Sequence, residues 1–369
     1  GFDRMRILIA QARSAASGGA EAYLRDLAKV LLDEGCAVGH VDIDGHQPPG
    51  ASGRGKPLGR AGRHLWNWAR VCRRLPEISR GYDRVILGYG EGPALDCPTL
   101  TVRHAPALFS TDPALIEYLG GQATAVRLAY TRACNAIARP ATNIGETITN
   151  SRWTARMMSD HCNEQAMGWL YPKINFEPGP MDHAPRKPYA IVSLGRIVPN
   201  KRFEDAIVFT DRLRSVGIPA ELDIIGRAEN PAYLRRLTEM TRQRPYVRIN
   251  LDLPDSERNR ILAQASLGFH GFRAEHFGMG VAEMIVAGVV PFVFDAGGVC
   301  ELVTDPGLRF QTVTEAADRA MSLLFRPDLR ERSLGKLQTG AALSQARNFE
   351  SCARDILMDW INGKLRDAA

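Results

Sequence analysis

Two glutamates in the segment RAEHFGMGVAEMIVAG, residues 273–288, are spaced so that each could bind a different part of one ligand. The apolar run before Glu275 predicts a strand, and the run after Gly278 predicts a helix that carries Glu283 about one turn from its start. Free N–H groups at such a helix start favour a phosphate, and a carboxylate one turn later can accept hydrogen bonds from both hydroxyls of a ribose. Glu275, further out on the loop, would then reach whatever is attached to the far phosphate.

The same two residues also have a purely structural interpretation. Glu283 would then only complement the helix dipole, a surface effect of roughly 0.3–1 kcal/mol, and Glu275 would be solvated. The glycines at 278 and 280 keep the backbone open in either case. The glutamate pair alone therefore leaves both interpretations open.

Two cations lie on the loop of the segment SLGRIVPNKRFEDA, residues 193–206. The predicted strand ends at Leu194, so Arg196 and Lys201 follow its carboxyl end, where α/β folds bind ligands. Two fixed positive charges at that place suit a diphosphate. The alternative is a solvated loop in which Asn200 caps the next helix.

A small-residue loop, SAASGGAEAYL at residues 14–24, joins another predicted strand to a helix. Gly18 and Gly19 permit close approach of the backbone to a ligand, and the helix start favours an anion. The alternative is an ordinary tight turn.

The positive charge of the chain is concentrated between residues 52 and 80. The chain has a formal net charge of +6, and this segment contains one acid, Glu77, against the cations Arg54, Lys56, Arg60, Arg63, Arg70, Arg73, Arg74 and Arg80. Because Trp66 and Trp68 are interleaved with these arginines, the segment suits an anionic membrane surface. The alternative is a core-facing apolar stripe with a solvated basic face. We expect no nucleic-acid partner.

Apolar runs alternate with helical patterns along both halves of the chain, which predicts an α/β protein with parallel strands joined by crossover helices. A proline-rich segment without periodicity, residues 171–188, separates the halves. We therefore expect an N-terminal domain over residues 1–175 and a C-terminal domain over 182–350, facing each other across a cleft. The amphipathic residues 351–369 are expected to form a helix that packs back on the N-terminal domain.

Composition excludes several classes of protein. The 369 residues are 45% hydrophobic and 24% charged, and no run of 18 or more apolar residues could span a bilayer. The seven cysteines form no CxxC pair, which argues against a zinc site or a disulfide framework. The acid pair Asp42 and Asp44 lies on an early strand, and we expect no catalytic metal. The apolar RILIA is too short for a secretory signal, so we expect a cytoplasmic protein, peripheral on the inner face of the membrane if the basic segment docks there.

The order of these motifs resembles one known family along nearly the whole chain. EHFGMGVAE is similar to the paired-glutamate signature of the retaining glycosyltransferases of family 4, which have the GT-B fold with two Rossmann-like domains. GGAE at 18–21, ITNSRWT at 148–154, SLGRIVPNK and DAGGVCELV resemble further segments of that family in the same order. The variant EHFGMG is similar to the mannosyltransferases that extend lipid-linked oligosaccharides on the cytosolic face of the endoplasmic reticulum.

The resemblance implies a role for each motif. Glu283 would bind the nucleotide ribose, and Glu275 would contact hydroxyls of the donor sugar near the reacting carbon. Arg196 and Lys201 would neutralise the diphosphate as its bond to the sugar breaks. The main-chain N–H donors would come from Met279, Gly280 and Val281, the first glycine loop from Gly18 and Gly19, and a histidine of the catalytic cleft from His104.

The implied activity is transfer of a hexose-type sugar from a nucleoside diphosphate sugar to a glycan, lipid-linked or small-molecule acceptor, with no cofactor. Two alternatives stay open. A sugar-nucleotide epimerase would convert the donor without an acceptor, and a non-catalytic subunit that docks on membranes through residues 52–80 would consume no donor. His270 and Gly271 stand where the family commonly has proline or serine, so the floor of the donor pocket is expected to differ.

Overall fold

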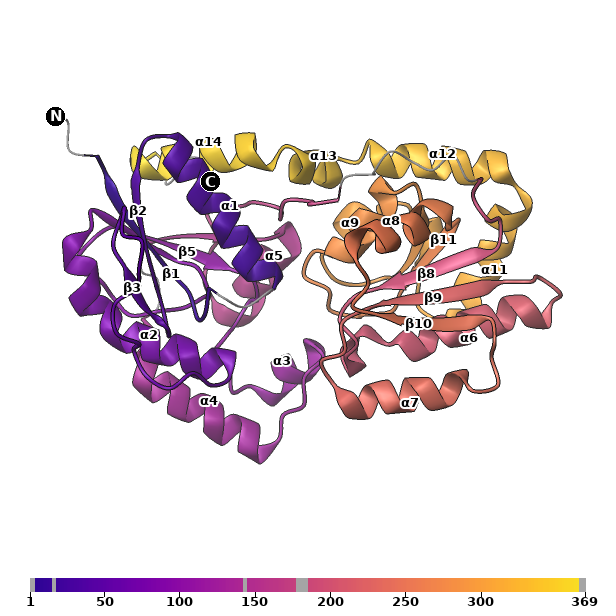
Figure 1. Ribbon diagram of the computed structural model, residues 1–369, viewed down its shortest axis with the longest axis horizontal. Coiled ribbons are helices and arrows are strands. Elements are labelled where there is room, and N and C mark those ends of the chain that lie inside the picture. Colours follow the sequence, from indigo (N-terminus) through magenta and orange to yellow (C-terminus); the bar gives the residue numbers. More distant parts are fainter. Residues whose placement is uncertain (1–3, 15–17, 142–144, 177–184, 365–369) are drawn as a thin grey trace. The chain divides into compact units, whose positions relative to one another are not determined.

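The computed structural model describes residues 4–14, 18–141, 145–176 and 185–364. The chain divides into two compact α/β units (Figure 1). The first comprises Gly1–Lys173 and Gln345–Ala369, and the second comprises Ile174–Ser344. Each unit is built around its own sheet, and each is described by itself below.

The first unit contains a seven-stranded sheet in the order β3-β2-β1-β4-β5-β6-β7. All neighbouring strands are parallel except β2 and β3, which form an antiparallel pair at one edge. The strands are β1 (Arg6–Ala10), β2 (Ala37–Asp42), β3 (Gly45–Gln47), β4 (Arg84–Leu87), β5 (Thr99–Arg103), β6 (Glu146–Thr149) and β7 (Gly168–Trp169).

Helices cover both faces of this sheet because β1 is apolar on both sides. Ile7 and Ile9 face one core, and Leu8 and Ala10 face the other, as the two-residue period of a strand requires. The helices of this unit are α1 (Gly19–Asp33), α2 (His64–Ile78), α3 (Pro113–Tyr118), α4 (Ala125–Ala138), α5 (Arg152–Cys162) and α14 (Phe349–Ile361). Helices α1 and α14 contribute to the first core, and α2 and α4 to the second.

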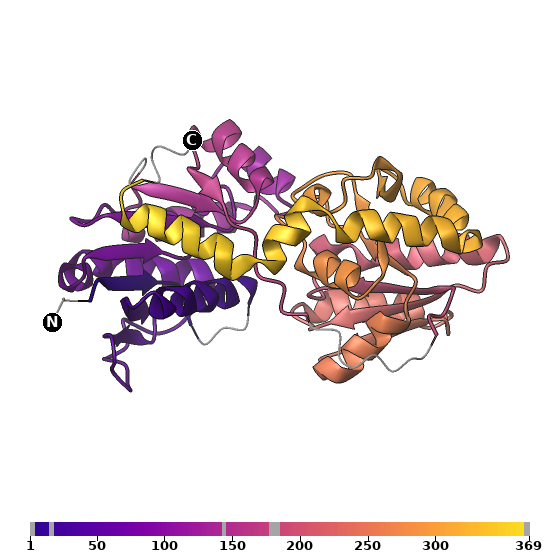
Figure 2. The ribbon, with the colours of Figure 1, turned by 90° about the horizontal axis from the view of Figure 1, so that it is seen from above.

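The C-terminal helix α14 packs beside α1, as Figures 1 and 2 show. Phe349, Leu357 and Trp360 are buried in the same core as Tyr23 of α1. Because this core includes Phe349, the second unit ends at Ser344 and not at residue 350, where the sequence placed its boundary.

Helix α2 forms the second half of the basic segment, and most of its apolar residues point into the protein. Trp68, Val71 and Leu75 are fully buried, and Trp66 is half-buried with the Arg70 guanidinium 5.9 Å from its ring centroid. This arrangement is the core-facing stripe of the structural alternative, so docking on a membrane would depend on the arginines. Within the ranges that the structure describes, the helices are all too short or too polar to cross a membrane.

The second unit contains a six-stranded parallel sheet in the order β10-β9-β8-β11-β12-β13. This is the strand order of a Rossmann fold, and it reverses direction between β8 and β11. The strands are β8 (Ala190–Leu194), β9 (Glu221–Gly226), β10 (Val247–Leu251), β11 (Leu267–His270), β12 (Val290–Phe294) and β13 (Arg309–Phe310).

Figure 1 shows α6 and α7 on one face of the second sheet and α8, α9 and α12 on the other. The helices of this unit are α6 (Phe203–Ser215), α7 (Pro231–Thr241), α8 (Asp255–Gln264), α9 (Met279–Val286), α10 (Val299–Leu302), α11 (Val313–Phe325) and α12 (Pro327–Gln338). A further helix, α13 (Ala341–Arg347), lies at the boundary of the two units. In an open α/β sheet, ligands bind at the carboxyl ends of the strands where the order reverses, which here are the ends of β8 and β11.

Candidate functional site

The loop after β8 leaves the sheet at Gly195, whose φ of +154° lies at the edge of the region that L side chains rarely adopt. It reaches the short 3-10 turn Pro199–Lys201 and then α6. The Ile197 N–H donates to the Arg227 carbonyl at 2.8 Å, which ties this loop to the loop after β9. Lys201 is thereby held near the carboxyl ends of the central strands.

We expect Gly226→Ala to destabilise the second unit and to displace the loop that carries Lys201. A Cβ at residue 226 would collide with the carbonyl oxygen of Gly195, so the backbone must shift, at a cost of about 1–3 kcal/mol. Thermal unfolding of the variant measures this loss. Gly335→Ala in α12 is the control, because its Cβ would meet no atom within 4 Å; an equal loss of stability in both variants would contradict the prediction.

The centre of the site is the carboxylate of Glu275. The Lys201 ammonium forms an ion pair with its Oε2, and Nε2 of His270 lies 3.1 Å from the same oxygen. The Lys201 Nζ also lies 4.7 Å from the ring centroid of Phe272. All of these side chains are largely withdrawn from solvent, with 13% of the Lys201 side chain and 14% of the Glu275 side chain exposed.

The electrostatics of this group favour an ionised Glu275 and a neutral His270. Burial alone would raise the pKa of Glu275, but the Lys201 charge and the neighbouring His270 imidazole outweigh it and hold the pKa well below its usual value. Burial lowers the pKa of His270, and the nearby Glu275 only partly opposes this shift. Nε2 is the imidazole nitrogen that faces the carboxylate, and it could donate to Glu275 in the tautomer that carries the proton there.

A tight turn holds the backbone of Glu275 in place. The Gly298 N–H donates to the Glu275 carbonyl at 2.6 Å. Gly297 has φ of +92°, and a Cβ there would lie 2.6 Å from the same carbonyl oxygen. This close approach explains the first glycine of the pair in DAGGVCELV.

Helix α9 begins beside the glutamate loop, at the end of β8. Gly278 precedes it with φ of +100°, and a Cβ on Gly280 would lie 3.0 Å from the Leu194 carbonyl oxygen. The first intrahelical bond runs from the Ala282 N–H to the Gly278 carbonyl, so the N–H groups of residues 279–281 have no acceptor within the helix. The helix start therefore offers donors for an anion.

Glu283 lies on the second turn of α9 and is partly buried. Burial raises the pKa of its carboxyl, the Arg258 guanidinium 3.7 Å away lowers it, and Asp255 raises it. Arg258 belongs to α8, so a residue far from the glutamate segment helps to keep Glu283 ionised.

The structure brings Lys201, Glu275 and residues 279–283 to one edge of the second sheet, but Arg196 does not join the Glu275 group. Its guanidinium is exposed and pairs with Glu229 at 3.0 Å.

The other predicted residues belong to the first unit. Gly18 precedes α1, and a Cβ there would collide with the Glu21 carboxylate, while Gly19 is the first residue of α1. His104 follows β5, with its ring edge-on to Tyr23 at a centroid distance of 5.1 Å. The part of SAASGG at 15–17 lies outside the described residues, as do 177–184 of the proline-rich segment.

Sequence reasoning assigned no role to His270 or Arg258. His270 was noted only as a departure from the family, although a histidine that ends the apolar strand LGFH is a usable signal. The signal for Arg258 was absent, because its contact with Glu283 is non-local. All seven cysteines are free thiols, and the described ranges contain no cluster of three or more His, Cys, Asp or Glu side chains suited to a metal.

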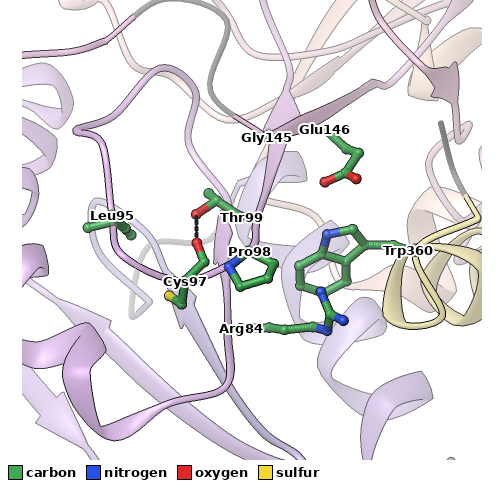
Figure 3. A pocket seen from close by; sticks show the side chains of 9 residues that line it. Arg84, Leu95, Cys97, Pro98, Thr99, Gly145, Glu146 and Trp360 are labelled. Carbon is green, nitrogen blue, oxygen red and sulfur yellow. Dashed lines mark hydrogen bonds between the residues drawn. The ribbon is translucent and has the colours of Figure 1, made fainter.

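A separate cavity of about 450 Å³ lies in the first unit (Figure 3). It is lined in part by Arg84, Thr99 and Glu146, which begin β4, β5 and β6, and by Trp360 of α14. Gly18 and His104 follow the opposite, carboxyl ends of β1 and β5, so this cavity is not part of the predicted site.

Comparison with known proteins gives one family match. Residues 182–333 match the model of the family described as glycosyl transferases group 1. This range contains Arg196, Lys201, Glu275 and residues 279–283.

The curated proteins that this chain is similar to are GDP-Man:Man(3)GlcNAc(2)-PP-Dol alpha-1,2-mannosyltransferases. The protein of Dictyostelium discoideum is 26% identical over 137 residues, which are 36% of this chain and 27% of that protein. The human protein is 37% identical over 65 residues, which are 18% of this chain and 13% of that protein. The matched parts thus span about a quarter or less of these two relatives.

Solved structures share the fold along nearly the full chain. WaaG, a glycosyltransferase involved in lipopolysaccharide biosynthesis, is 14% identical with a TM-score of 0.68, covering 95% of this chain and 99% of that chain. Sucrose-phosphate synthase of Thermosynechococcus elongatus is 16% identical with a TM-score of 0.68, covering 99% and 100%. The predicted GT-B fold, with two Rossmann-like units, is confirmed.

Proposed function

We propose that this chain, whose second unit carries a glycosyl transferases group 1 match, is a glycosyltransferase that moves a hexose-type sugar from a nucleoside diphosphate sugar to an acceptor hydroxyl. The observation that carries the proposal is one edge of the second sheet. There the Lys201–Glu275 pair, the N–H groups of residues 279–281 and Glu283 lie at the ends of the central strands, within the matched residues.

Each group at this edge has chemistry suited to one part of the donor. The start of α9 would bind the diphosphate, and Glu283 would accept hydrogen bonds from the ribose hydroxyls. Lys201 would stabilise the negative charge that grows on the leaving diphosphate. Glu275 would accept hydrogen bonds from the sugar near the reacting carbon, and its low pKa keeps it ionised for that role.

The proposed reaction replaces the bond from the anomeric carbon to the phosphate oxygen by a bond to the acceptor oxygen. The acceptor proton passes to an oxygen of the leaving diphosphate on the same face of the sugar, which would retain the configuration. Retention and membership of family 4 are proposed on the resemblance of EHFGMGVAE to the paired-glutamate signature. Trapping a glycosyl adduct on Glu275 would contradict this route.

Several finer assignments belong to the same proposal. The mannosyltransferase relatives favour GDP-mannose as the first donor to test and a glycan or lipid-linked glycan as the acceptor class. Gly18, Gly19 and His104 keep the roles that the family resemblance implies, and Arg196 keeps its role toward the diphosphate. We propose that the reaction uses no metal or other cofactor. We also propose that the protein is cytoplasmic and reaches lipid-linked acceptors through the arginines of the basic segment.

The experiment that tests the function is nucleotide release from a panel of UDP-, GDP-, ADP- and dTDP-sugars without added acceptor. We expect slow release from one donor, because enzymes of this kind transfer the sugar to water when no acceptor is bound. Conversion of the donor sugar into an epimer without release would instead support an epimerase. No binding and no release with any donor would support the docking subunit.

We expect Glu283→Ala to weaken binding of the selected nucleoside diphosphate by roughly 10- to 100-fold, because hydrogen bonds to a charged group are worth about 1.5–3 kcal/mol. Titration calorimetry measures the dissociation constant. The control is Glu331→Ala on the exposed surface of α12, which should bind as the native chain does. Equal affinities in the two variants would remove Glu283 from the nucleotide site.

A further inference from the structure

We propose that His270 is a positioning residue for the transfer reaction, which holds the Glu275 carboxylate in its catalytic orientation when Lys201 turns to the donor diphosphate. This inference rests on the proposed function and assigns a role to a residue that the paired-glutamate signature does not include. His270 itself is not expected to touch the donor.

The geometry that points to this role is the approach of two nitrogens to one oxygen. The imidazole Nε2 is buried and has no aligned hydrogen-bond partner among the described residues, so it is free to take up this oxygen when the lysine leaves. The Lys201 ammonium and the His270 Nε2 both contact Oε2 of Glu275, and neither contact uses Oε1. A carboxylate held in this way has one oxygen fixed by the protein and another that can accept hydrogen bonds from a sugar hydroxyl.

The two donors differ in how firmly they are held. Lys201 sits on the loop after β8 and has a flexible side chain that must also serve the diphosphate. His270 is the last residue of β11, is 4% exposed, and is attached to a strand paired with β8 and β12. The imidazole is therefore the contact that can stay unchanged while the lysine changes partner.

The backbone that follows His270 is closely packed. The next residue is Gly271, where a Cβ would lie 3.2 Å from the Cβ of Arg202. This close packing places the start of α6 against the end of β11. A side chain at 271 would therefore require Arg202 or the end of the strand to shift by a few tenths of an ångström.

The charged and titratable groups that act on Glu275 are Lys201 and His270 in the described part of the chain. Without the imidazole N–H, Lys201 alone would oppose the burial of the carboxylate, so the pKa of Glu275 should rise. Since Glu275 must be ionised to accept hydrogen bonds from the sugar, the acid limb of the pH profile should move to higher pH.

The test compares the native chain with His270→Leu and His270→Gln, using the donor selected by the panel. Leucine fills the space without a donor, whereas the glutamine amide can place an N–H near the position of Nε2. For His270→Leu we expect kcat to fall roughly tenfold or more, as misplaced catalytic groups do, while affinity for the nucleoside diphosphate is unchanged. The pH at which kcat falls on the acid side should be about one unit higher than in the native chain. His270→Gln should restore most of the rate.

Three results decide the matter. A folded His270→Leu variant with native kcat and a native pH profile would overturn the proposal. An equal fall of kcat in the leucine and glutamine variants, with an unchanged acid limb of the pH profile, would also overturn it, because it would indicate a space-filling role. If His270→Leu does not fold, His270→Asn takes its place, because its shorter amide cannot reach Glu275. A native chain that turns over no donor would instead refute the proposed function, a failure that is seen before any variant is made.

Discussion

Replacement of Glu275 by glutamine is expected to reduce donor turnover by roughly two to three orders of magnitude, the cost of removing a preorganised electrostatic group. The substitution keeps the volume and removes the charge that accepts hydrogen bonds from the sugar. It also removes the ion-pair partner of Lys201 and the negative charge beside His270. The measurement is kcat for nucleotide release.

The matched control for this variant is Glu331→Gln, the same change on the exposed surface of α12. Its turnover should equal that of the native chain. The nucleoside diphosphate should bind to Glu275→Gln with near-native affinity, because the ribose and the diphosphate are assigned to other groups. Native turnover by Glu275→Gln would show that this carboxylate does not take part in the reaction.

Replacement of Lys201 by alanine is expected to lower kcat by about a hundredfold and to change the KM for the donor much less. The reason is that the charge on the leaving diphosphate grows as the bond to the sugar breaks, so the ammonium stabilises the transition state more than the ground state. Steady-state kinetics at saturating and at low donor concentration separate the two constants.

Lys336→Ala, on the exposed side of α12, is the control for loss of a lysine. Removing Lys201 also leaves the buried Glu275 with His270 as its remaining partner, so thermal unfolding must be measured beside the kinetics. A Lys201→Ala variant that is folded and loses donor affinity with unchanged kcat would assign the lysine to ground-state binding.

The sequence predicted the framework of the second unit well, because strand ends and helix starts are marked by local patterns. The end of β8 at Leu194 and the start of α9 at Met279 agree with the expected elements. Both are followed or preceded by glycines whose backbone angles or close contacts require glycine. Such signals are local, so a single sequence contains them.

The partners of the functional side chains were not predictable in the same way. Arg258 reaches Glu283 from α8, and Arg196 turns to Glu229 on the loop after β9. These contacts depend on how neighbouring strands and helices are aligned, which no local pattern encodes. The burial of Trp66 and Trp68 was likewise undecided until the position of α2 on the sheet was known.

The most direct test of the account is a crystal structure of the chain with the nucleoside diphosphate released in the donor panel. We predict that the diphosphate lies against the N–H groups of residues 279–281 with Lys201 Nζ in contact, and that both ribose hydroxyls donate to Glu283. A nucleotide bound in the first unit, or elsewhere on the second, would contradict the assignment of the donor site to the carboxyl ends of β8 and β11.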